Sequence, residues 1–341
     1  MRFVGLILFY VISFSFVKAQ NSSSSFAALD LPLSARHAVL NEPVSLYSQD
    51  SEAGILNPAM LNEKMEKQLS LNFVDYFSDI NFVSVAYALP LAEFGTVGIS
   101  VKSIGYGEFT ETDFTSQSQG TFGANEQIVS FGLGKELSER WSVGASVKTL
   151  FSNLQDYQSV ALASDLAMAY KKEDKNFSMS FLARNYGKQI STYASTKEML
   201  PFQLDFGLSK RLEHLPFLLT LNYKNIQKWD LTSIYEVGSS NDLNGNDDSE
   251  EISISNKLFR HIDVGGELSI GKHIQLRMGY NPKLRQELKV DSYLGMVGFS
   301  WGLGIKISHF TINYGRSTYH LHGSPNYFSF STDFSKFYKQ Q

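Results

Sequence analysis

The strongest constraint on this chain is a two-residue alternation of apolar and polar side chains that recurs from residue 68 to about residue 334. In residues 94–107, for example, Val97, Ile99 and Val101 share one face, and the residue that follows each of them, a glycine, a serine and a lysine, lies on the other. Successive side chains of a β-strand point to opposite faces of a sheet, so this pattern predicts strands rather than helices.

Fourteen segments show this alternation, each bounded by turn-forming residues. Their approximate ranges are 68–76, 79–90, 94–107, 122–136, 140–152, 158–172, 175–187, 199–212, 215–228, 257–271, 273–284, 293–307, 308–319 and 325–334. A single-chain barrel of a bacterial outer membrane has an even number of antiparallel strands. The sequence therefore predicts an all-β, 14-stranded antiparallel transmembrane β-barrel over residues 68–341.

The lengths of the predicted connections support this topology. Connections after even-numbered segments are short, such as 91–93 and 137–139, and most of the others are longer, notably 108–121 and 229–256. The first connection, near Phe77, is a short exception. Outer-membrane barrels have short periplasmic turns and longer external loops. We therefore expect an outer-membrane protein with both termini in the periplasm.

The two faces of the predicted strands differ in side-chain size. One face carries large apolar residues, and the other carries Gly, Ser, Ala and Asn. A sheet in hydrocarbon must close so that every backbone N–H and C=O is paired. Large residues would then contact lipid, and small polar residues would face a crowded lumen. The alternative is a secreted soluble β protein, in which the large apolar residues would pack inside. The aromatic content of 13% combined with a mean hydropathy of only −0.16 fits a membrane barrel.

Charges of both signs fall on the predicted lumen face. They are Lys102, Lys148, Asp165, Arg184, Asp205, Lys224, Asp263, Glu267, Arg277 and Lys306. These charges could line a substrate path or form salt bridges that fill and stiffen the barrel. The balance of signs favours salt bridges, because an unpaired charge away from water is costly.

The chain begins with the features of a secretory signal peptide over residues 1–19. Arg2 is followed by the apolar run Phe3–Val17 and by a possible cleavage site before Gln20. The alternative is an uncleaved anchor, but a membrane-spanning helix needs roughly 20 apolar residues, more than this run supplies.

Residues 20–67 form a leader before the first predicted strand. Residues 48–55 and 59–67 are compatible with helices. The lumen of a 14-stranded barrel exceeds what its own side chains fill. We therefore predict that residues 26–67 fold into the barrel as a plug, with a periplasmic docking segment as the alternative.

No pattern of catalytic or metal-binding residues stands out. The chain has no cysteine, which excludes disulfides, cysteine-ligated zinc and thiol enzymes. The net charge of −4 disfavours a nucleic-acid partner. His320 and His322 lie two residues apart without a supporting cluster. We therefore predict a protein that is not an enzyme and has no cofactor and no metal.

The predicted connection 229–256 contains an acidic stretch that is a candidate partner-binding loop. The residues proposed for this role are Asn241, Asp242, Asn244, Asp247 and Asp248. An EF-hand is disfavoured, because Asp247 replaces the required glycine and Ser253 replaces the required glutamate. A solvated external loop without a ligand is the simpler interpretation.

The segment just before the first predicted strand resembles a known family. Asn57, Pro58 and Ala59 are similar to the Asn-Pro-Ala segment of FadL-like outer-membrane barrels. That resemblance implies a 14-stranded barrel with an N-terminal plug.

A second resemblance is narrower. The leader motif Ser34, Ala35 and Arg36, the chain length and the C-terminal segment 310–325 resemble the PorQ-like, PorV-related barrels of the type IX secretion system of Bacteroidota. This resemblance implies a non-catalytic barrel of the attachment complex, which processes cargo and joins it to lipopolysaccharide. The implied partners are a PorZ-like surface protein, PorU, PorV-like members and outer-membrane lipid.

Two main functional hypotheses follow. The first is an outer-membrane anchor whose external loops, mainly 229–256 and 108–121, bind a surface partner. The second is a FadL-like transporter of hydrophobic small molecules, with an apolar pocket beneath the external loops and a lateral opening or movable plug. A barrel enzyme would require His261, His273 or His309 beside a serine.

Overall fold

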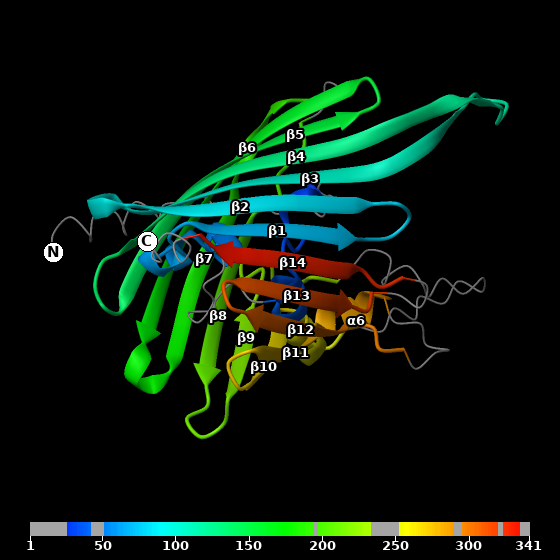
Figure 1. The fold of residues 1–341 in the computed structure, drawn as a ribbon. Coiled ribbons are helices and arrows are strands. Elements are labelled where there is room, and N and C mark those ends of the chain that lie inside the picture. The colour runs from blue at the N-terminus through cyan, green and yellow to red at the C-terminus, as the bar shows by residue number, and fades with distance from the viewer. Residues whose placement is uncertain are drawn as a thin grey trace.

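The computed structural model describes residues 26–41, 51–193, 197–232, 252–288, 295–319 and 323–334. Fourteen antiparallel strands form one closed barrel in sequence order, and β1 pairs with both β2 and β14 (Figure 1). The predicted fold class is therefore confirmed. No helix in the described part of the chain is long and apolar enough to span a membrane.

The observed strands coincide with the fourteen predicted segments, with shifted ends. They are β1 Gln68–Asp75, β2 Asn81–Leu91, β3 Gly95–Thr112, β4 Ser118–Glu136, β5 Trp141–Leu154, β6 Tyr157–Lys172, β7 Phe177–Ser191, β8 Gln203–Arg211, β9 Phe217–Tyr223, β10 Ile262–Ile270, β11 Ile274–Tyr280, β12 Phe299–Ile307, β13 Phe310–Ser317 and β14 Asn326–Asp333.

Strand length divides the barrel into two sides. Strands β3 to β7 have 14 to 19 residues, and we call them the long side. Strands β8 to β14 have seven to nine residues and form the short side. The long strands extend past the others at one end, which we call the hairpin end (Figure 1). The opposite end, where β1 begins and β14 ends, is the terminal end.

The two strand faces lie as the sequence predicts. Outward residues of the strands are exposed, as at Val83, Phe131 and Val147. Their neighbours Ser84 and Ser130 point inward and are buried. The barrel thus has an apolar outer surface and a lumen face rich in small polar residues.

Three predicted boundaries are wrong for identifiable reasons. The connection 108–121 is mostly strand, because Phe109 pairs with Phe122 and only residues 113–117 form the turn. Residues 257–259 belong to helix α5, Ile254–Phe259, which begins after the N-capping Ser253. Residues 282–284 begin helix α6, Pro282–Leu288, where proline ends the strand and opens the helix.

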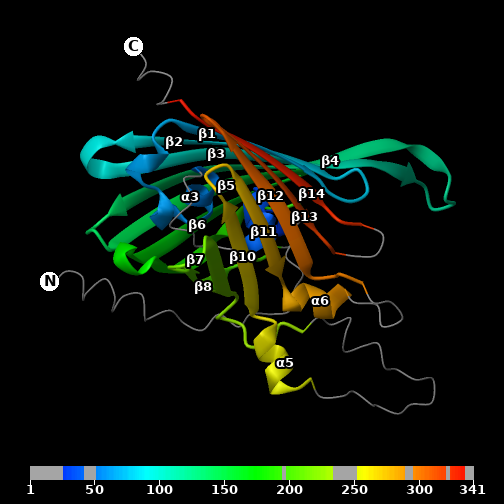
Figure 2. The same ribbon diagram turned by 60° about the horizontal axis from the view of Figure 1, so that its bottom comes forward.

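The described parts of the N-terminal segment, residues 26–41 and 51–67, lie inside the barrel and contain short helices (Figures 1 and 2). They are η1 Ala27–Leu29, α2 Ala35–Leu40, α3 Ser51–Leu56, η2 Pro58–Met60 and η3 Glu63–Met65. Helix α2 was not predicted from the sequence, although Ser34 is a typical N-cap residue. Residues 1–19, the loop residues Asn241 to Asp248, and His320 and His322 lie outside the described residues.

Candidate functional site

The barrel interior contains the candidate site, and the N-terminal segment is its floor. Residues of η2 pack against glycines of β4 and β5. A Cβ added at Gly144 would lie 2.2 Å from the Pro58 carbonyl carbon, and one at Gly134 would lie 2.4 Å from the Pro58 oxygen. No larger residue fits at either position without moving the backbone. These glycines form the long-side seat of the segment.

A second glycine seat lies across the barrel and holds helix α2. A Cβ at Gly279 of β11 would lie 1.8 Å from the Val39 oxygen. A Cβ at Gly315 of β13 would lie 2.7 Å from the Ala35 oxygen. We call this the short-side seat. The N-terminal segment is therefore clamped at two sites on different walls of the barrel.

Side chains of the barrel wall satisfy the free carbonyl groups at the end of α2. The Ser317 hydroxyl donates to the Ala38 carbonyl at 3.1 Å, and the Ser300 hydroxyl donates to the Val39 carbonyl at 2.8 Å. The Asn222 amide donates to the Asn41 carbonyl at 3.0 Å. The last carbonyl groups of a helix have no partner within the helix, so these bonds tie its end to the wall.

The leader motif has structural roles. The Ser34 hydroxyl accepts a hydrogen bond from the His37 N–H at 3.3 Å and caps α2. The Ala35 N–H donates to Ser329 of β14 at 2.9 Å. Arg36 lies 3.5 Å from the Glu267 carboxylate.

The Asn-Pro-Ala motif is equally well anchored. The Asn57 side chain donates to Ser180 of β7 at 3.1 Å and accepts from the Ala59 N–H at 3.1 Å. The Ser142 hydroxyl donates to the Ala59 carbonyl at 2.8 Å. This motif therefore joins the floor to the long side of the barrel.

Most of the predicted lumen charges form a belt of ion pairs around the interior, which we call the charge belt. The pairs are Lys148–Asp165 at 2.6 Å, Arg184–Asp205 at 3.0 Å, Lys224–Asp263 at 2.8 Å and Arg277–Glu267 at 2.8 Å. Lys102 instead donates to the carbonyls of Ala28 and Leu31 at 3.0 and 3.1 Å. Lys306 is half-buried and forms no ion pair within the described part of the chain.

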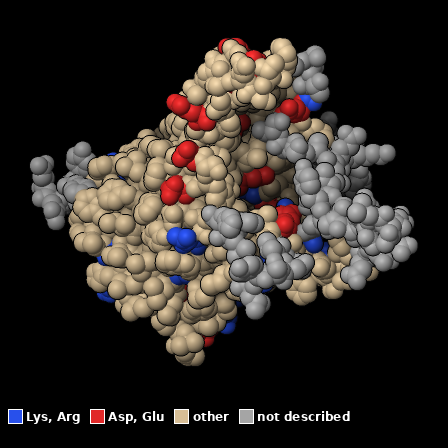
Figure 3. Space-filling model, turned by 90° about the vertical axis from the view of Figure 1, so that its right-hand side faces the viewer, with Lys and Arg blue, Asp and Glu red and all other residues tan. Residues whose placement is uncertain are grey.

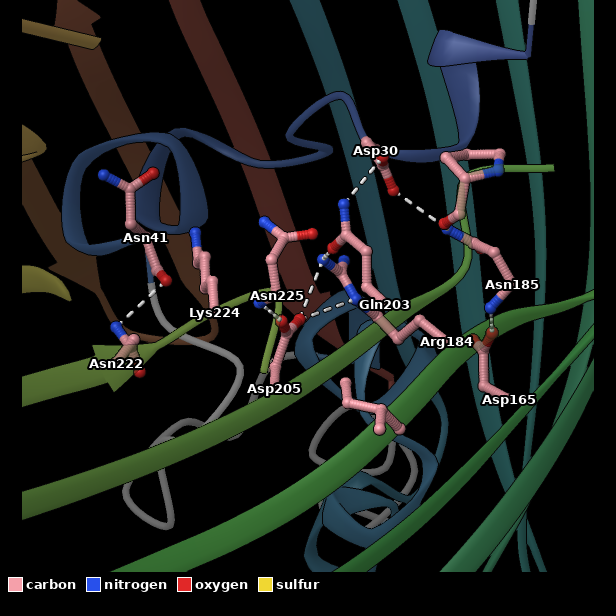
Figure 4. Close-up of polar contacts among 12 residues, drawn as sticks. Asp30, Asn41, Asp165, Arg184, Asn185, Gln203, Asp205, Asn222, Lys224 and Asn225 are labelled. Carbon is pink, nitrogen blue, oxygen red and sulfur yellow. Dashed lines mark hydrogen bonds and ion pairs between the residues drawn. The ribbon is translucent and has the colours of Figure 1, made fainter. Parts of the chain in front are cut away.

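The charge belt also bonds to the backbone of the wall and to the floor (Figure 4). Asp165 accepts from the N–H of Asn185 at 2.9 Å, and Asp205 accepts from the N–H of Asn225 at 3.0 Å. Asp30 of the floor accepts from the side chains of Asn185 and Gln203, each at 2.8 Å. The bonds to Asp30 fix the floor to β7 and β8 at the level of the belt.

An apolar layer lies on the hairpin side of the charge belt and contacts the floor. Its buried wall residues are Val74, Phe82, Ile104, Ile128, Leu150, Ala161 and Tyr327, and they pack with Phe26 and Leu29. The sequence predicts small polar residues on this face, so the layer was missed. A signal exists, because Ile104 and Leu150 follow the inward Lys102 and Lys148 by two residues.

A hydrogen-bonded network crosses the wall just above the apolar layer. Glu126 of β4 is only 4% exposed. The Tyr106 hydroxyl donates to its Oε2 at 2.8 Å, and the Ser152 hydroxyl donates to its Oε1 at 3.0 Å. Tyr193 in turn donates to Ser152 at 2.5 Å. We call these four residues the Glu126 network.

The protruding hairpins present apolar side chains beyond the network. Phe109 and Phe122 continue the inward register of β3 and β4, and their rings stack with centroids 5.4 Å apart. Leu154 and Tyr157 end the inward register of β5 and β6 and are exposed. We call these four residues the aromatic mouth. Figure 3 shows that the hairpin end is hollowed, with acidic side chains around and inside the hollow.

Two of the three histidines named as possible catalytic residues, His261 and His273, bond to backbone carbonyls. The His261 ring nitrogens face the carbonyls of Lys224 and Trp229 at 2.7 and 3.2 Å. His273 lies 2.9 Å from the Lys306 carbonyl. Among the described residues, no group of three or more His, Asp or Glu side chains is placed to hold a metal ion.

Comparison with solved structures shows which barrels this fold is similar to. A TodX monoaromatic hydrocarbon channel mutant matches with a TM-score of 0.53 and 14% identity, over 88% of this chain and 99% of that one. A FadL homologue from Pseudomonas aeruginosa matches with a TM-score of 0.50 and 10% identity, over 88% and 98% of the two chains. The fold is therefore that of outer-membrane β-barrels of the FadL/TodX type. No protein-family model and no curated protein matches the sequence.

Proposed function

We propose that this protein is an outer-membrane barrel that takes up small hydrophobic molecules at its hairpin end. One observation carries the proposal: two groups of apolar side chains, the aromatic mouth and the apolar layer, lie on the hairpin side of the floor, with the Glu126 network between them. Binding sites for small ligands are concave and mostly apolar, with a few polar groups that fix orientation. We further propose that the termini are periplasmic and that the hairpin end faces outward.

The proposed route has a defined floor. Phe26 and Leu29 close the apolar layer from below, and Lys102 holds their turn through two carbonyls. A molecule that passes further must displace this turn. Because the glycine seats and the charge belt fix the floor on both sides, we expect binding at the mouth to be easier than passage.

Photolabelling tests the binding step. The protein is reconstituted in vesicles with a dodecanol analogue that carries an alkyl diazirine, irradiated, and digested for mass spectrometry. We expect adducts on inward residues such as Ile104 and Ile128, besides those on lipid-facing Val101 and Val129.

Matched variants separate the interior from the lipid face. Phe122→Ala in the aromatic mouth should lower labelling of the inward residues. Phe131→Ala, on the lipid-facing side of the same strand, should leave it unchanged. Labelling confined to the lipid-facing residues would refute uptake through the interior.

A second candidate function is that of a non-catalytic, PorQ-like anchor in the type IX secretion attachment complex. The observation that favours it is the floor clamped in two glycine seats, because a closed barrel suits a rigid support better than a conduit. Its partners would be a PorZ-like surface protein with PorU, PorV-like members and lipopolysaccharide. The protruding β3–β4 hairpin and the acidic loop 241–251 would bind the surface partner.

The absence of cysteine allows a clean test between the two functions. Ala35→Cys and Ser329→Cys, joined by a disulfide or a short bifunctional maleimide, would lock the floor to β14. Locking should abolish passage of a hydrophobic probe if the protein is a conduit. If it is an anchor, the locked protein should still co-purify with its surface partner, and shortening the β3–β4 hairpin or deleting residues 238–251 should release that partner.

A further inference from the structure

The Glu126 network lies between two apolar regions, where a carboxylate is unexpected. The apolar layer begins with Ile128, two residues along the same face of β4. Phe122 of the aromatic mouth lies four residues away in the other direction. A hydrophobic molecule that enters as proposed above must pass Glu126 or stop beside it.

Two hydroxyls of the network are directed at this carboxylate, and the third, that of Tyr193, is directed at Ser152. Tyr106 donates to one oxygen, and Ser152 donates to the other. Because Ser152 accepts from Tyr193, its own proton is free to point at Glu126. The network therefore acts as a set of donors that holds an anionic acceptor in place.

No basic side chain of the described residues forms an ion pair with this carboxylate. The basic residue on the neighbouring strand, Lys102, directs its ammonium group to the carbonyls of Ala28 and Leu31 and lies 5.5 Å from the Phe82 ring centre. The direct contacts of the Glu126 carboxylate are therefore hydroxyl groups, and Lys102 acts on it only through a longer-range attraction.

The network remains reachable from the hairpin end. Tyr106, Tyr193 and the adjoining Leu200 are half-buried rather than buried. A ligand that lies against Leu200 and the apolar layer would place a polar head group beside these tyrosines and the carboxylate. An ammonium head could pair with Glu126, a hydroxyl could donate to it, and a carboxylate would be repelled.

We infer that this site selects hydrophobic molecules with an amine or hydroxyl head group and rejects fatty-acid carboxylates, a specificity set by Glu126. The inference rests on the proposed uptake function and names its substrate class. Specificity of this kind arises because a like charge at close range in a poorly hydrated site is costly, whereas an opposite charge is favourable.

A competition experiment tests the inference with chains of equal length. Dodecylamine, 1-dodecanol and dodecanoate compete at pH 7.5 with the photoreactive dodecanol analogue, at matched concentrations measured in the vesicle membrane. Labelling of inward and lipid-facing residues is quantified separately. We expect dodecylamine to protect the inward residues at a concentration about tenfold lower than dodecanoate, with dodecanol between them.

Two variants assign the effect to one carboxylate. Glu126→Gln keeps the shape of the side chain and removes its charge. In this variant, the concentrations of dodecylamine and dodecanoate that protect the inward residues should lie within about threefold of each other. Glu136→Gln removes a carboxylate at the terminal end that pairs with Lys171, and it should keep the preference. A heat-induced gel shift verifies that both variants are folded barrels.

The outcomes are distinguishable. Inward labelling that all three competitors reduce equally would overturn the specificity while leaving uptake intact. Absence of inward labelling with every probe would refute the uptake function itself. A preference for dodecanoate, or an amine preference that survives in Glu126→Gln, would also overturn the assignment to Glu126.

Discussion

The long and short sides of this barrel share the alternation of apolar and polar side chains, but they contact different parts of the molecule. On the short side, strands of seven to nine residues hold α2 through glycines and serine hydroxyls. On the long side, strands of 14 to 19 residues reach past the charge belt. The extra length carries the Glu126 network and the aromatic mouth, and the apolar layer continues from the long side onto β1, β2 and β14. Strand length, rather than the polarity of the lumen face, therefore indicates where the candidate site lies.

The Arg184–Asp205 pair of the charge belt, which joins β7 of the long side to β8 of the short side, should show the largest effect. Asp205→Ala removes the buried carboxylate that pairs with Arg184 and accepts from the Asn225 N–H, and breaking a buried ion pair in this way costs about 3–5 kcal/mol. We expect the urea midpoint for unfolding from lipid vesicles to fall sharply. Lys171→Ala, which breaks the exposed pair with Glu136, should cost at most about 1 kcal/mol. Equal effects of the two variants would contradict a structural role for the belt.

Substitutions in the two glycine seats should weaken the packing of the N-terminal segment against each side of the barrel separately. Gly279→Ala places a Cβ against the Val39 carbonyl, and Gly144→Ala places one against Pro58. Overpacking of this kind costs about 1–3 kcal/mol. Hydrogen exchange measured peptide by peptide should rise at residues 35–41 in the first variant and at residues 57–61 in the second.

A neutral substitution controls for the effect of any added methyl group. A Cβ at Gly105 would meet nothing within 4 Å, so Gly105→Ala should change exchange in neither segment. If either seat variant raised exchange equally in both segments, the two seats would have to be treated as one cooperative unit.

Ser300→Ala should loosen α2 on the short side and leave the long side unchanged. It removes the donor to the Val39 carbonyl, and a single hydrogen bond of this kind contributes about 1 kcal/mol. Exchange should rise at α2, whereas photolabelling of Ile104 and Ile128 on the long side should stay constant. Ser209→Ala, a change of equal size on the inner face away from α2, provides the matched comparison. A drop in interior labelling would show that α2 controls the long-side site.

The smallest effect is expected at the tip of the β3–β4 hairpin. Donation from the Thr115 hydroxyl and from the Gln117 N–H lowers the pKa of Asp113. Because the pKa of Asp113 is lower in the folded state than in the unfolded state, its ionised carboxylate stabilises the turn at pH values above the ordinary pKa of Asp. This stabilisation is lost as the pH falls through the lowered pKa. Asp113→Asn should remove this pH dependence. The NMR chemical shifts of the turn amides, measured between pH 6 and pH 2, should follow this titration. Amide shifts that do not change with pH in the parent protein would contradict the prediction.

The alternation of side chains was enough to predict the barrel, because burial in a membrane barrel follows a period of two. All fourteen strands lie within segments that the sequence predicts, apart from extensions such as that of β3 and β4 into residues 108–121. That extension was hard to predict, because Gly107 of β3 and Gly120 and Gly123 of β4 resemble turn signals. In the structure they lie in a two-stranded ribbon with β-bulges.

The interior was less predictable for a different reason. The pairing of the lumen charges depends on strand register, which the sequence does not give. Lys148, Asp165, Arg184 and Asp205 could therefore be predicted as inward residues, but the Lys148–Asp165 and Arg184–Asp205 pairs could not. The apolar layer was missed because each wall residue comes from a different strand and only the closed barrel brings them together. Glu126 was missed as well, since it follows a polar stretch in which no alternation is visible.

The short strands also set how the protein meets its lipids. Strands β9 and β11 have seven residues, and at about 3.3 Å per residue and a tilt of roughly 40° they rise only about 18 Å along the membrane normal. The apolar band of an outer-membrane barrel is about 25 Å tall. Acyl chains beside these strands must therefore compress, while those beside β3 to β7 need not. The protein should sit in its bilayer as a wedge, and the thinned lipid should draw neighbours with equally short apolar bands to that flank.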